Sequence, residues 1–275
     1  MKNSKAVWPW AVMGVVLVGG AAWWLFRDDL VPAAGTSPFA AQAPAGASRL
    51  ESPPATSAAQ PAQTPQYPLE RDDSADAGLP ALGDSDATAQ QALASLFASD
   101  VLVLLRQDHL IQRLVMHIDN LTEPTMPSNA LAARPVPGGL QVEGDAASGG
   151  IHVAAANAAR YAPWVQAFTA VDADALAAAY LRLYPLVQDA WREAGHPDGH
   201  FNDRLIAVID HLLQAPEPAR PLEVERDERG RYRFVDPGLQ SRSVGQKLLL
   251  RLDAEQSRAV RQQLRAIRQA VTRGG

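Results

Sequence analysis

The feature that most constrains this chain is an uncharged apolar run of 21 residues, Ala6 to Phe26, near its N-terminus. As a helix, the run would rise about 31 Å, close to the thickness of the hydrocarbon layer of a bilayer. Two Trp residues lie near each end of it: Trp8, Trp10, Trp23 and Trp24. Indole rings favour the two headgroup regions of a membrane. The run therefore predicts a transmembrane anchor over residues 6–26, with the lipid bilayer as its partner.

The charges that flank this run indicate its orientation. Lys2 and Lys5 precede it and Arg27 follows it, so the positive-inside rule favours a cytoplasmic N-terminus. We therefore expect a single-pass protein of the inner membrane whose C-terminal domain is periplasmic. A cleaved signal peptide is the alternative, because Gly19 and Ala21 are small residues at a suitable spacing. The apolar residues that continue beyond them favour an uncleaved anchor.

A linker follows the predicted anchor. Residues 30–69 contain eight Pro and only two charged residues, a composition that cannot bury a core. We expect four parts in the chain: a cytoplasmic N-terminus (1–5), the anchor (6–26), a flexible linker (27–79) and a soluble α-helical domain (80–275).

The domain is predicted to be mainly α, with one or two short β-hairpins. Apolar residues recur there every three or four positions, between Pro- and Gly-rich breaks. Helices are expected after an Asp84 N-cap, over 110–121, from an Asn157 cap to Val171, from Asp172 to about 194, and over 201–212, 243–251 and 254–272. Strands are expected over 140–142 with 151–153, and over 222–226 with 231–234.

Composition excludes several chemistries. The chain has no Cys, which rules out a thiol nucleophile, a thiolate zinc site and a redox pair. It also lacks a Gly-rich phosphate loop and a nucleophile elbow, and we expect no cofactor. Charge is uneven along the chain: residues 1–219 carry 12 basic and 23 acidic side chains, whereas residues 220–275 carry 13 and 7.

The densest group of acid, base and metal-capable side chains lies in the sequence HPDGHFNDR. Its members are His196, Asp198, His200, Asn202, Asp203 and Arg204. On a helix, His200 and Asp203 would share a face, which makes them weak candidates for a metal site. The alternative is structural: Asp198 caps the helix, Asn202 and Arg204 bond the loop backbone, and the histidines are solvated.

Other polar residues interrupt apolar helices. Asp210 and His211 lie within such a helix, and we expect one of them to form a structural ion pair. Possible partners are Arg134, Arg160 and Arg251. Tyr161, Tyr180 and Tyr184 are expected to fill the core. Arg134 and Tyr161 are kept as candidate binding residues beside the cluster.

The last helix carries a predicted basic face of Arg258, Arg261, Arg265 and Arg268. Such a stripe can bind an anionic partner, bind the protein's own acidic residues, or face water. Nucleic acid is not expected, because the domain is predicted to lie outside the cytoplasm and no aromatic residues are interleaved with the arginines.

Several motifs resemble a bacterial family known as domain of unknown function 3014. They are NDRLIAVIDHLL (202–213), SVGQKLLLRL (243–252), RPVPG (134–138), NAARY (157–161), YLRLYPL (180–186) and HPDGHFNDRL (196–205). The likeness covers about residues 80–271. It implies a membrane-anchored protein, but no activity or catalytic residue. His196 departs from the family, in which an aromatic residue is common.

Two functions follow as hypotheses. The first is a binding or scaffold module that contacts a protein or another component of the cell envelope. The second is an envelope hydrolase or metal-binding protein that uses the cluster from His196 to Arg204. A deep pocket that gathers His200, Asp203 and distant carboxylates would favour the second hypothesis, and a shallow surface with these groups locked in hydrogen bonds would favour the first.

Overall fold

The computed structural model describes residues 64–70 and 78–273, apart from residues 135, 137, 146, 148, 220 and 229. The predicted anchor over residues 6–26 and most of the predicted linker lie outside these ranges. Within them, no helix combines the length and the apolar character that crossing a membrane requires.

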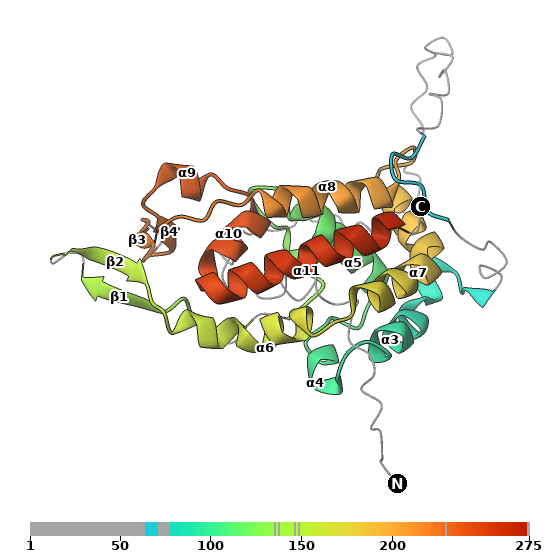
Figure 1. The fold of residues 1–275 in the computed structure, drawn as a ribbon, viewed down its shortest axis with the longest axis horizontal. Coiled ribbons are helices and arrows are strands. Elements are labelled where there is room, and N and C mark those ends of the chain that lie inside the picture. Colours follow the sequence, from blue (N-terminus) through green and yellow to red (C-terminus); the bar gives the residue numbers. More distant parts are fainter. Residues whose placement is uncertain are drawn as a thin grey trace, which may run out of the picture.

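The described part of the domain is mainly helical, with one small sheet (Figure 1). Its helices are η2 (Leu82–Asp84), α3 (Asp86–Ala94), α4 (Ser99–Leu102), α5 (Leu110–Asn120), η3 (Ser128–Ala130), α6 (Asn157–Thr169), α7 (Ala173–Glu193), α8 (Phe201–Leu213), α9 (Pro237–Gln240), α10 (Val244–Arg251) and α11 (Ala254–Arg273). Its strands are β1 (Val142–Asp145), β2 (Gly150–Val153), β3 (Glu223–Arg226) and β4 (Tyr232–Phe234). The predicted fold class is confirmed for this part of the chain.

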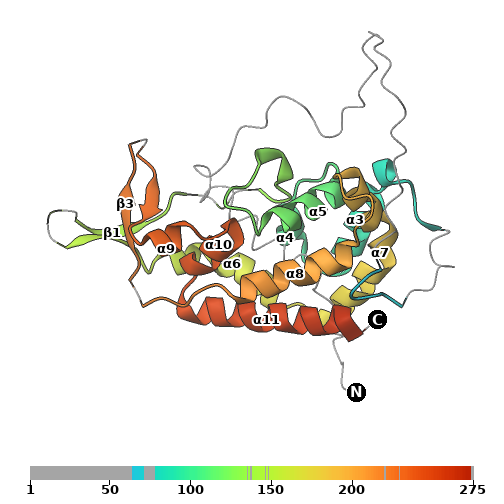
Figure 2. The same ribbon diagram turned by 90° about the horizontal axis from the view of Figure 1, so that it is seen from above.

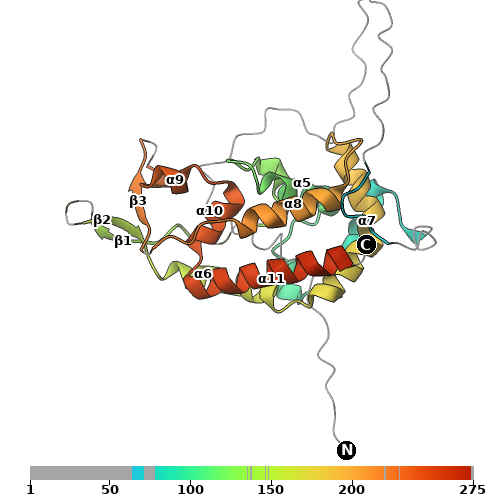
Figure 3. The same ribbon diagram turned by 45° about the horizontal axis from the view of Figure 1, so that its top comes forward.

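The core lies between α5, α7, α8 and α11. Helix α6 also packs against α11, as α7 does. Helix α11 runs along the long axis of the molecule, with α8 on one side and α6 and α7 on the other (Figures 1 and 3). Its apolar stripe is fully buried in this contact: Val260, Leu264, Ile267 and Val271. Burial of such a stripe, at helical spacing, is the main force that holds α11 in place.

The ends of α7 follow the local rules that predicted them. The carboxylate of Asp172 accepts a hydrogen bond from the N–H of Ala175 at 2.8 Å, so Asp172 is the N-cap. After the helix, Gly195 adopts φ +107°, which favours glycine. Pro185 lies inside the helix.

Two predicted caps are wrong. Asp84 is the last residue of the short helix η2, and the cap position of α3 is occupied by Ser85. Asn157 is the first residue of α6, but its side chain is buried and bonds Gln141 and Ala154. These bonds fasten the start of α6 to the residue before β1, so a tertiary contact replaces the expected local cap.

The two predicted hairpins join into one antiparallel sheet with the order β1-β2-β3-β4. The joint is made by Ile151, which pairs with Val224 across β2 and β3. A second apolar cluster lies beneath the sheet and includes Val224, Phe234 and Leu250. The hairpins extend from the end of the molecule where α9 and α10 lie (Figure 2).

Helix α10 is enclosed: every residue from Val244 to Arg251 is buried. Its first turn lies against α5 and α8, where the N–H of Gly245 donates to the carbonyl of Leu121 at 3.0 Å. A Cβ atom at Gly245 would lie 2.9 Å from that carbonyl oxygen and would overlap a methyl group of Leu212. Only glycine allows this close approach without movement of its neighbours.

Candidate functional site

The loop that holds the predicted cluster is fixed to α7. The side chain of Gln188 donates to the carbonyl of Gly199 at 2.7 Å and accepts from the N–H of Phe201 at 3.0 Å. The ring of His196 stacks on Trp191, with centroids 3.6 Å apart and planes 10° apart. This role requires a flat ring rather than an imidazole, so another aromatic residue could fill it.

Two residues of the cluster hold a segment of the chain that lies far away in sequence. The carboxylate of Asp203 accepts hydrogen bonds from the N–H groups of Gln66 (3.0 Å) and Tyr67 (2.8 Å). The amide of Asn202 donates to the carbonyl of Tyr67 at 2.9 Å and accepts from the buried hydroxyl of Tyr180 at 3.3 Å. Residues 64–70, predicted as part of a flexible linker, instead lie against the domain because these main-chain bonds hold them.

The side chains of this segment alternate between the domain and solvent. Pro65, Tyr67 and Leu69 are half-buried, whereas the residues between them are exposed. Tyr67 and Leu69 pack against the main core. The guanidinium of Arg268, on α11, lies 5.9 Å from the centre of the Tyr67 ring. The domain therefore holds this segment of its own chain by the main chain and by alternate side chains.

The remaining residues of the cluster are used structurally or lie in solvent. Arg204 donates to the Asp119 carboxylate at 2.6 Å and also bonds the Asp119 carbonyl and the Thr122 hydroxyl. Asp198 is exposed and does not cap α8 as expected, because the N-cap position is occupied by His200. Among the described residues, no group of three or more His, Asp or Glu side chains could hold a metal ion.

The predicted basic face of α11 is divided between protein contacts and solvent. Arg261 is buried and donates to the carbonyls of Leu213 (3.0 Å), the last residue of α8, and Ala215 (2.9 Å), which lies just beyond it. Arg268 forms a two-point ion pair with Asp210 at 2.6 and 2.9 Å. Arg258 and Arg265 are exposed. Two of the four arginines thus satisfy groups of the protein itself.

The Asp210–Arg268 contact confirms the predicted ion pair but not its predicted partners. Arg134, Arg160 and Arg251 do not bond Asp210. Arg134 is exposed, and its N–H donates to the carbonyl of Leu104. His211 instead bonds the hydroxyl of Ser243 at 2.8 Å. Desolvation, together with the nearby charges of Arg204 and Arg242, lowers the pKa of His211.

The three tyrosines are buried, as predicted. Burial raises the pKa of Tyr161, and the charges of Arg251 and Arg160 act in the opposite direction. Because Arg251 is the last residue of α10, its charge acts on Tyr161 of α6 from the end of that helix. No hydrogen bond or ion pair among the described residues joins Tyr161 or Arg134 to the cluster from His196 to Arg204.

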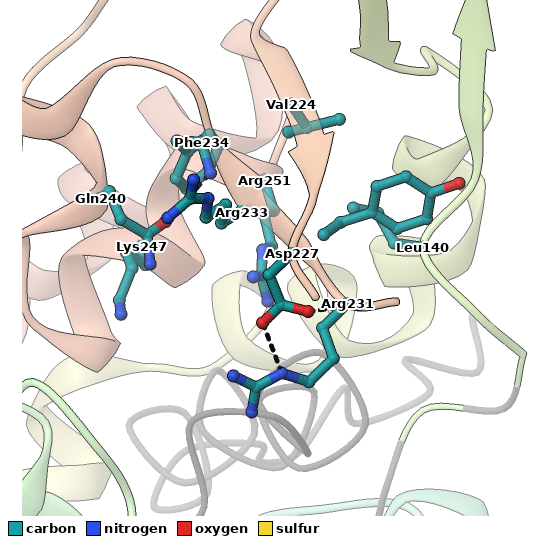
Figure 4. A pocket seen from close by; sticks show the side chains of 10 residues that line it. Leu140, Val224, Asp227, Arg231, Arg233, Phe234, Gln240, Lys247 and Arg251 are labelled. Atoms are coloured by element: carbon teal, nitrogen blue, oxygen red, sulfur yellow. Dashed lines mark hydrogen bonds and ion pairs between the residues drawn. The ribbon is translucent and has the colours of Figure 1, made fainter. Parts of the chain in front are cut away.

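A pocket that sequence reasoning missed lies between α10 and the β3–β4 hairpin (Figure 4). Its volume is about 200 Å³. Its lining is Leu140, Val224, Asp227, Arg231, Tyr232, Arg233, Phe234, Gln240, Lys247 and Arg251. Basic side chains thus enter it from α10 and from the hairpin, and apolar side chains complete its walls.

The hairpin positions its share of these groups by local bonds. Asp227 accepts hydrogen bonds from the N–H of Arg231 (2.9 Å) and from its guanidinium (2.8 Å), and Gly230 between them has φ +76°. Arg233 pairs with Glu225 on the neighbouring strand at 2.8 Å. From α10, the ammonium of Lys247 donates to the carbonyl of Pro124 at 3.3 Å.

The sequence carries two signals for this pocket. One is the basic bias of residues 220–275. The other is the motif SVGQKLLLRL, in which Lys247 and Arg251 interrupt an apolar helix at a spacing of four residues. That spacing brings both side chains to one face of α10.

One further titratable group is buried away from both sites. His117, on α5, is completely buried beside η3. Desolvation lowers its pKa to about 4, an effect that the main chain of Ala130 only partly opposes. This imidazole is therefore neutral at physiological pH.

Comparison with known proteins gives a family without an activity. A family model described as "Protein of unknown function (DUF3014)" matches residues 110–268. No curated protein matches the chain, and no solved structure does.

Proposed function

Since the chain belongs to DUF3014, a family of unknown function, we propose from its own contacts that it is a membrane-tethered binding or scaffold module of the cell envelope. Residues 6–26 would anchor it in the inner membrane. The domain would lie in the periplasm and contact a protein or another envelope component.

The observation that carries this proposal is that Asn202, Asp203 and Arg204, within the cluster from His196 to Arg204, bond other segments of the chain. Both oxygens of Asp203 accept main-chain N–H groups of residues 66 and 67. Asn202 bonds the same segment, and Arg204 bonds Asp119 and Thr122. A general base or a metal ligand needs a lone pair that faces substrate or metal. These side chains instead bind peptide and neighbouring loops, which supports a role in binding.

A cavity beside this cluster, lined in part by Phe201 and Leu205, also supports a binding role. It has a volume of about 70 Å³ and lies between α5, α7, α8 and α11. Tyr180, Phe201 and Leu205 are part of its wall, and no charged side chain of the described residues lines it. A hydrolase would need acid, base or metal-binding groups at such a cavity.

Affinity purification of the full chain after crosslinking in cells tests the proposal. The matched control is a chain of residues 1–79, which keeps the predicted anchor and linker but lacks the domain. We expect a defined envelope component to be enriched with the full chain and absent from the control. Equal recovery with both baits would contradict a binding role for the domain.

Two further measurements separate the alternatives. Ester, phosphoester and peptide substrates should not be turned over by the purified chain, and turnover that Asp203→Asn abolishes would favour the hydrolase. A reporter fused after Gly275 should be active only if it is an exported type. An active cytoplasmic reporter would refute the periplasmic location.

A further inference from the structure

A further pocket lies between α11 and the chain that follows α8. Its volume is about 380 Å³, within the roughly 300–1,000 Å³ of typical ligand pockets. We call it the α11 pocket; its charged and proline lining consists of Arg258, Arg261, Arg265, Pro216, Glu217 and Pro218. Three of the four arginines of the predicted basic face of α11 thus line one hollow.

These three arginines differ in what they bond. Arg261 is buried, donates to two main-chain carbonyls, and forms an ion pair with Glu217 at 3.3 Å. Arg258 and Arg265 are exposed. In the part of the chain that the structure describes, neither of these two forms a hydrogen bond or an ion pair. The pocket therefore presents two guanidinium groups whose donors are available to a ligand.

The charge of the lining selects an anionic ligand. Three arginines against the one carboxylate of Glu217 leave an excess of two positive charges among the residues that line the pocket. The side chain of Glu217 is 75% exposed, and its carboxylate nevertheless reaches Arg261. A carboxylate is thus an anion that this pocket already accepts, and guanidinium groups bind carboxylates through directed hydrogen bonds.

The spacing of the two available arginines constrains where the carboxylates of a ligand lie. Arg258 and Arg265 are seven positions apart, which brings them to one face of α11 with a rise of about 10.5 Å between them. In a polyproline II chain, positions i and i+3 share a face and lie about 9 Å apart. Acidic residues at every third position of an extended peptide would therefore meet both arginines.

The shape of the pocket favours a peptide over a lipid surface. Leu249, which is 1% exposed, is part of the lining, and Pro216 and Pro218 are half-buried. A bilayer surface is flat on this scale, so it would meet Arg258 and Arg265 without reaching Leu249. A peptide chain is narrow enough to bring apolar side chains between the two arginines.

We propose that the α11 pocket binds an extended acidic segment of a partner protein, with a carboxylate at every third position and small apolar residues between them. One carboxylate pairs with Arg258 and the next pairs with Arg265, and the intervening apolar residues lie toward Leu249. This inference names the chemistry of a partner for the proposed binding module and in that sense rests on it.

Calorimetric titration of the purified full chain in a non-ionic detergent, at constant ionic strength, tests the inference. The probes are three acetylated and amidated peptides: EPAEPAE, its neutral counterpart QPAQPAQ, and EEEPAPA, which has the composition of the first but clustered charges. Glycerol phosphate, the polar part of anionic glycerolipids, is the fourth probe. We expect saturable binding of EPAEPAE at millimolar concentration or below, binding of EEEPAPA and of glycerol phosphate that is about fivefold weaker or more, and no binding of QPAQPAQ.

Three results would overturn the proposal. Absence of saturable binding of EPAEPAE at millimolar concentration excludes the peptide site. Equal affinity for EEEPAPA means that net charge, rather than the spacing of the two arginines, attracts the peptide. Binding of glycerol phosphate as tightly as EPAEPAE identifies an anionic lipid as the ligand.

Matched variants locate the site. Arg258→Gln and Arg265→Gln together should weaken EPAEPAE binding about tenfold, since an exposed ion pair contributes up to about fivefold. Both side chains are exposed and Gln has a similar helix propensity, so the double variant should keep its fold. Arg192→Gln with Arg273→Gln removes two other exposed arginines, changes the net charge equally, and should leave affinity within about twofold. Equal weakening by the two double variants overturns the site.

The resident carboxylate gives a test of opposite sign. Glu217→Gln removes the acidic group that competes for Arg261, so it should tighten EPAEPAE binding at least twofold. Asp174→Asn, which removes an exposed carboxylate elsewhere, is its control and should change affinity less. Equal tightening by both variants overturns the role of Glu217 and with it the site. An envelope component enriched in cells without peptide binding would overturn this inference and leave the binding module intact.

Discussion

His117 lies fully buried in α5, so mild acid should weaken the fold by an amount that its pKa determines. The pKa of its imidazole is about 4 in the folded protein, against 6.5 for the unperturbed group. As pH falls below 6.5, the unfolded chain takes up a proton that the folded protein resists. The contribution of His117 is therefore complete above pH 6.5 and is lost as pH falls toward 4.

The size of this loss follows from the two pKa values. Between pH 7.5 and pH 4.5, the linkage relation gives a decrease of about 2.5 kcal/mol in the free energy of unfolding from this one group. Carboxylates and His211 add further pH dependence. The His117→Leu variant keeps those groups and replaces the ring with an apolar side chain of similar size.

Urea unfolding of both proteins at a series of pH values isolates the effect. The fluorescence of the buried Trp164 and Trp191 reports unfolding. We expect the free energy of unfolding to fall with acid by about 2.5 kcal/mol more in the wild type than in His117→Leu. Parallel pH profiles would refute the reasoning. So would a pKa near 6.5 for His117 in an NMR titration of the folded protein, a measurement that does not require the variant to fold.

Three contacts give further predictions. Asp203→Asn should speed amide exchange across residues 64–70 about tenfold, because Asn keeps only one of the two oxygens that accept the N–H groups of Gln66 and Tyr67. Exchange at the wild-type rate would show that Asp203 does not hold the segment. Gly245→Ala should lower the free energy of unfolding by about 1–3 kcal/mol despite the better helix propensity of Ala, and a stabilised variant in urea unfolding would contradict the close approach to Leu121. A double-mutant cycle with Asp210→Asn and Arg268→Gln should give a coupling of about 0.2–1 kcal/mol, since both side chains are about one-third exposed; a coupling of zero would mean that the pair does not form in solution.

Much of the fold can be predicted from local patterns in the sequence. The three- and four-residue spacing of apolar residues predicts α5, α7, α8 and α11 and the faces that they bury. The Asp and Gly residues at the ends of α7 act over one turn, so their positions suffice to predict those ends.

Pairings between distant residues were not readable in this way. The contact between β2 and β3 joins residues 151 and 224, and no local feature selects that partner. One of Asp210 and His211 was correctly expected to form an ion pair, but the partner of Asp210, Arg268, lies 58 positions away and could be chosen only from the packing of α8 against α11. Asn157 resembled a cap because Asn favours helix starts, but its amide bonds the strand region instead.

In the cluster from His196 to Arg204, too, the local pattern is visible in the sequence and the distant partner is not. Its density of polar groups correctly marked a place where many hydrogen bonds are made. Its partner was hidden, because the segment around Tyr67 lies in a Pro-rich stretch that reads as linker. The basic pocket was missed because Lys247 and Arg251 are separated in sequence from the hairpin arginines and meet them only after the sheet and α10 pack together.

The position of α11 determines how far apart these two regions are. Its first turn follows directly on α10 and the basic pocket, and Arg268, near its other end, contacts the ring of Tyr67. Fourteen residues of helix separate the two, a rise of about 21 Å. A helix does not stretch under load as a loop does, so α11 acts as a rigid spacer. The basic pocket and the contact with Tyr67 are therefore kept at a constant separation.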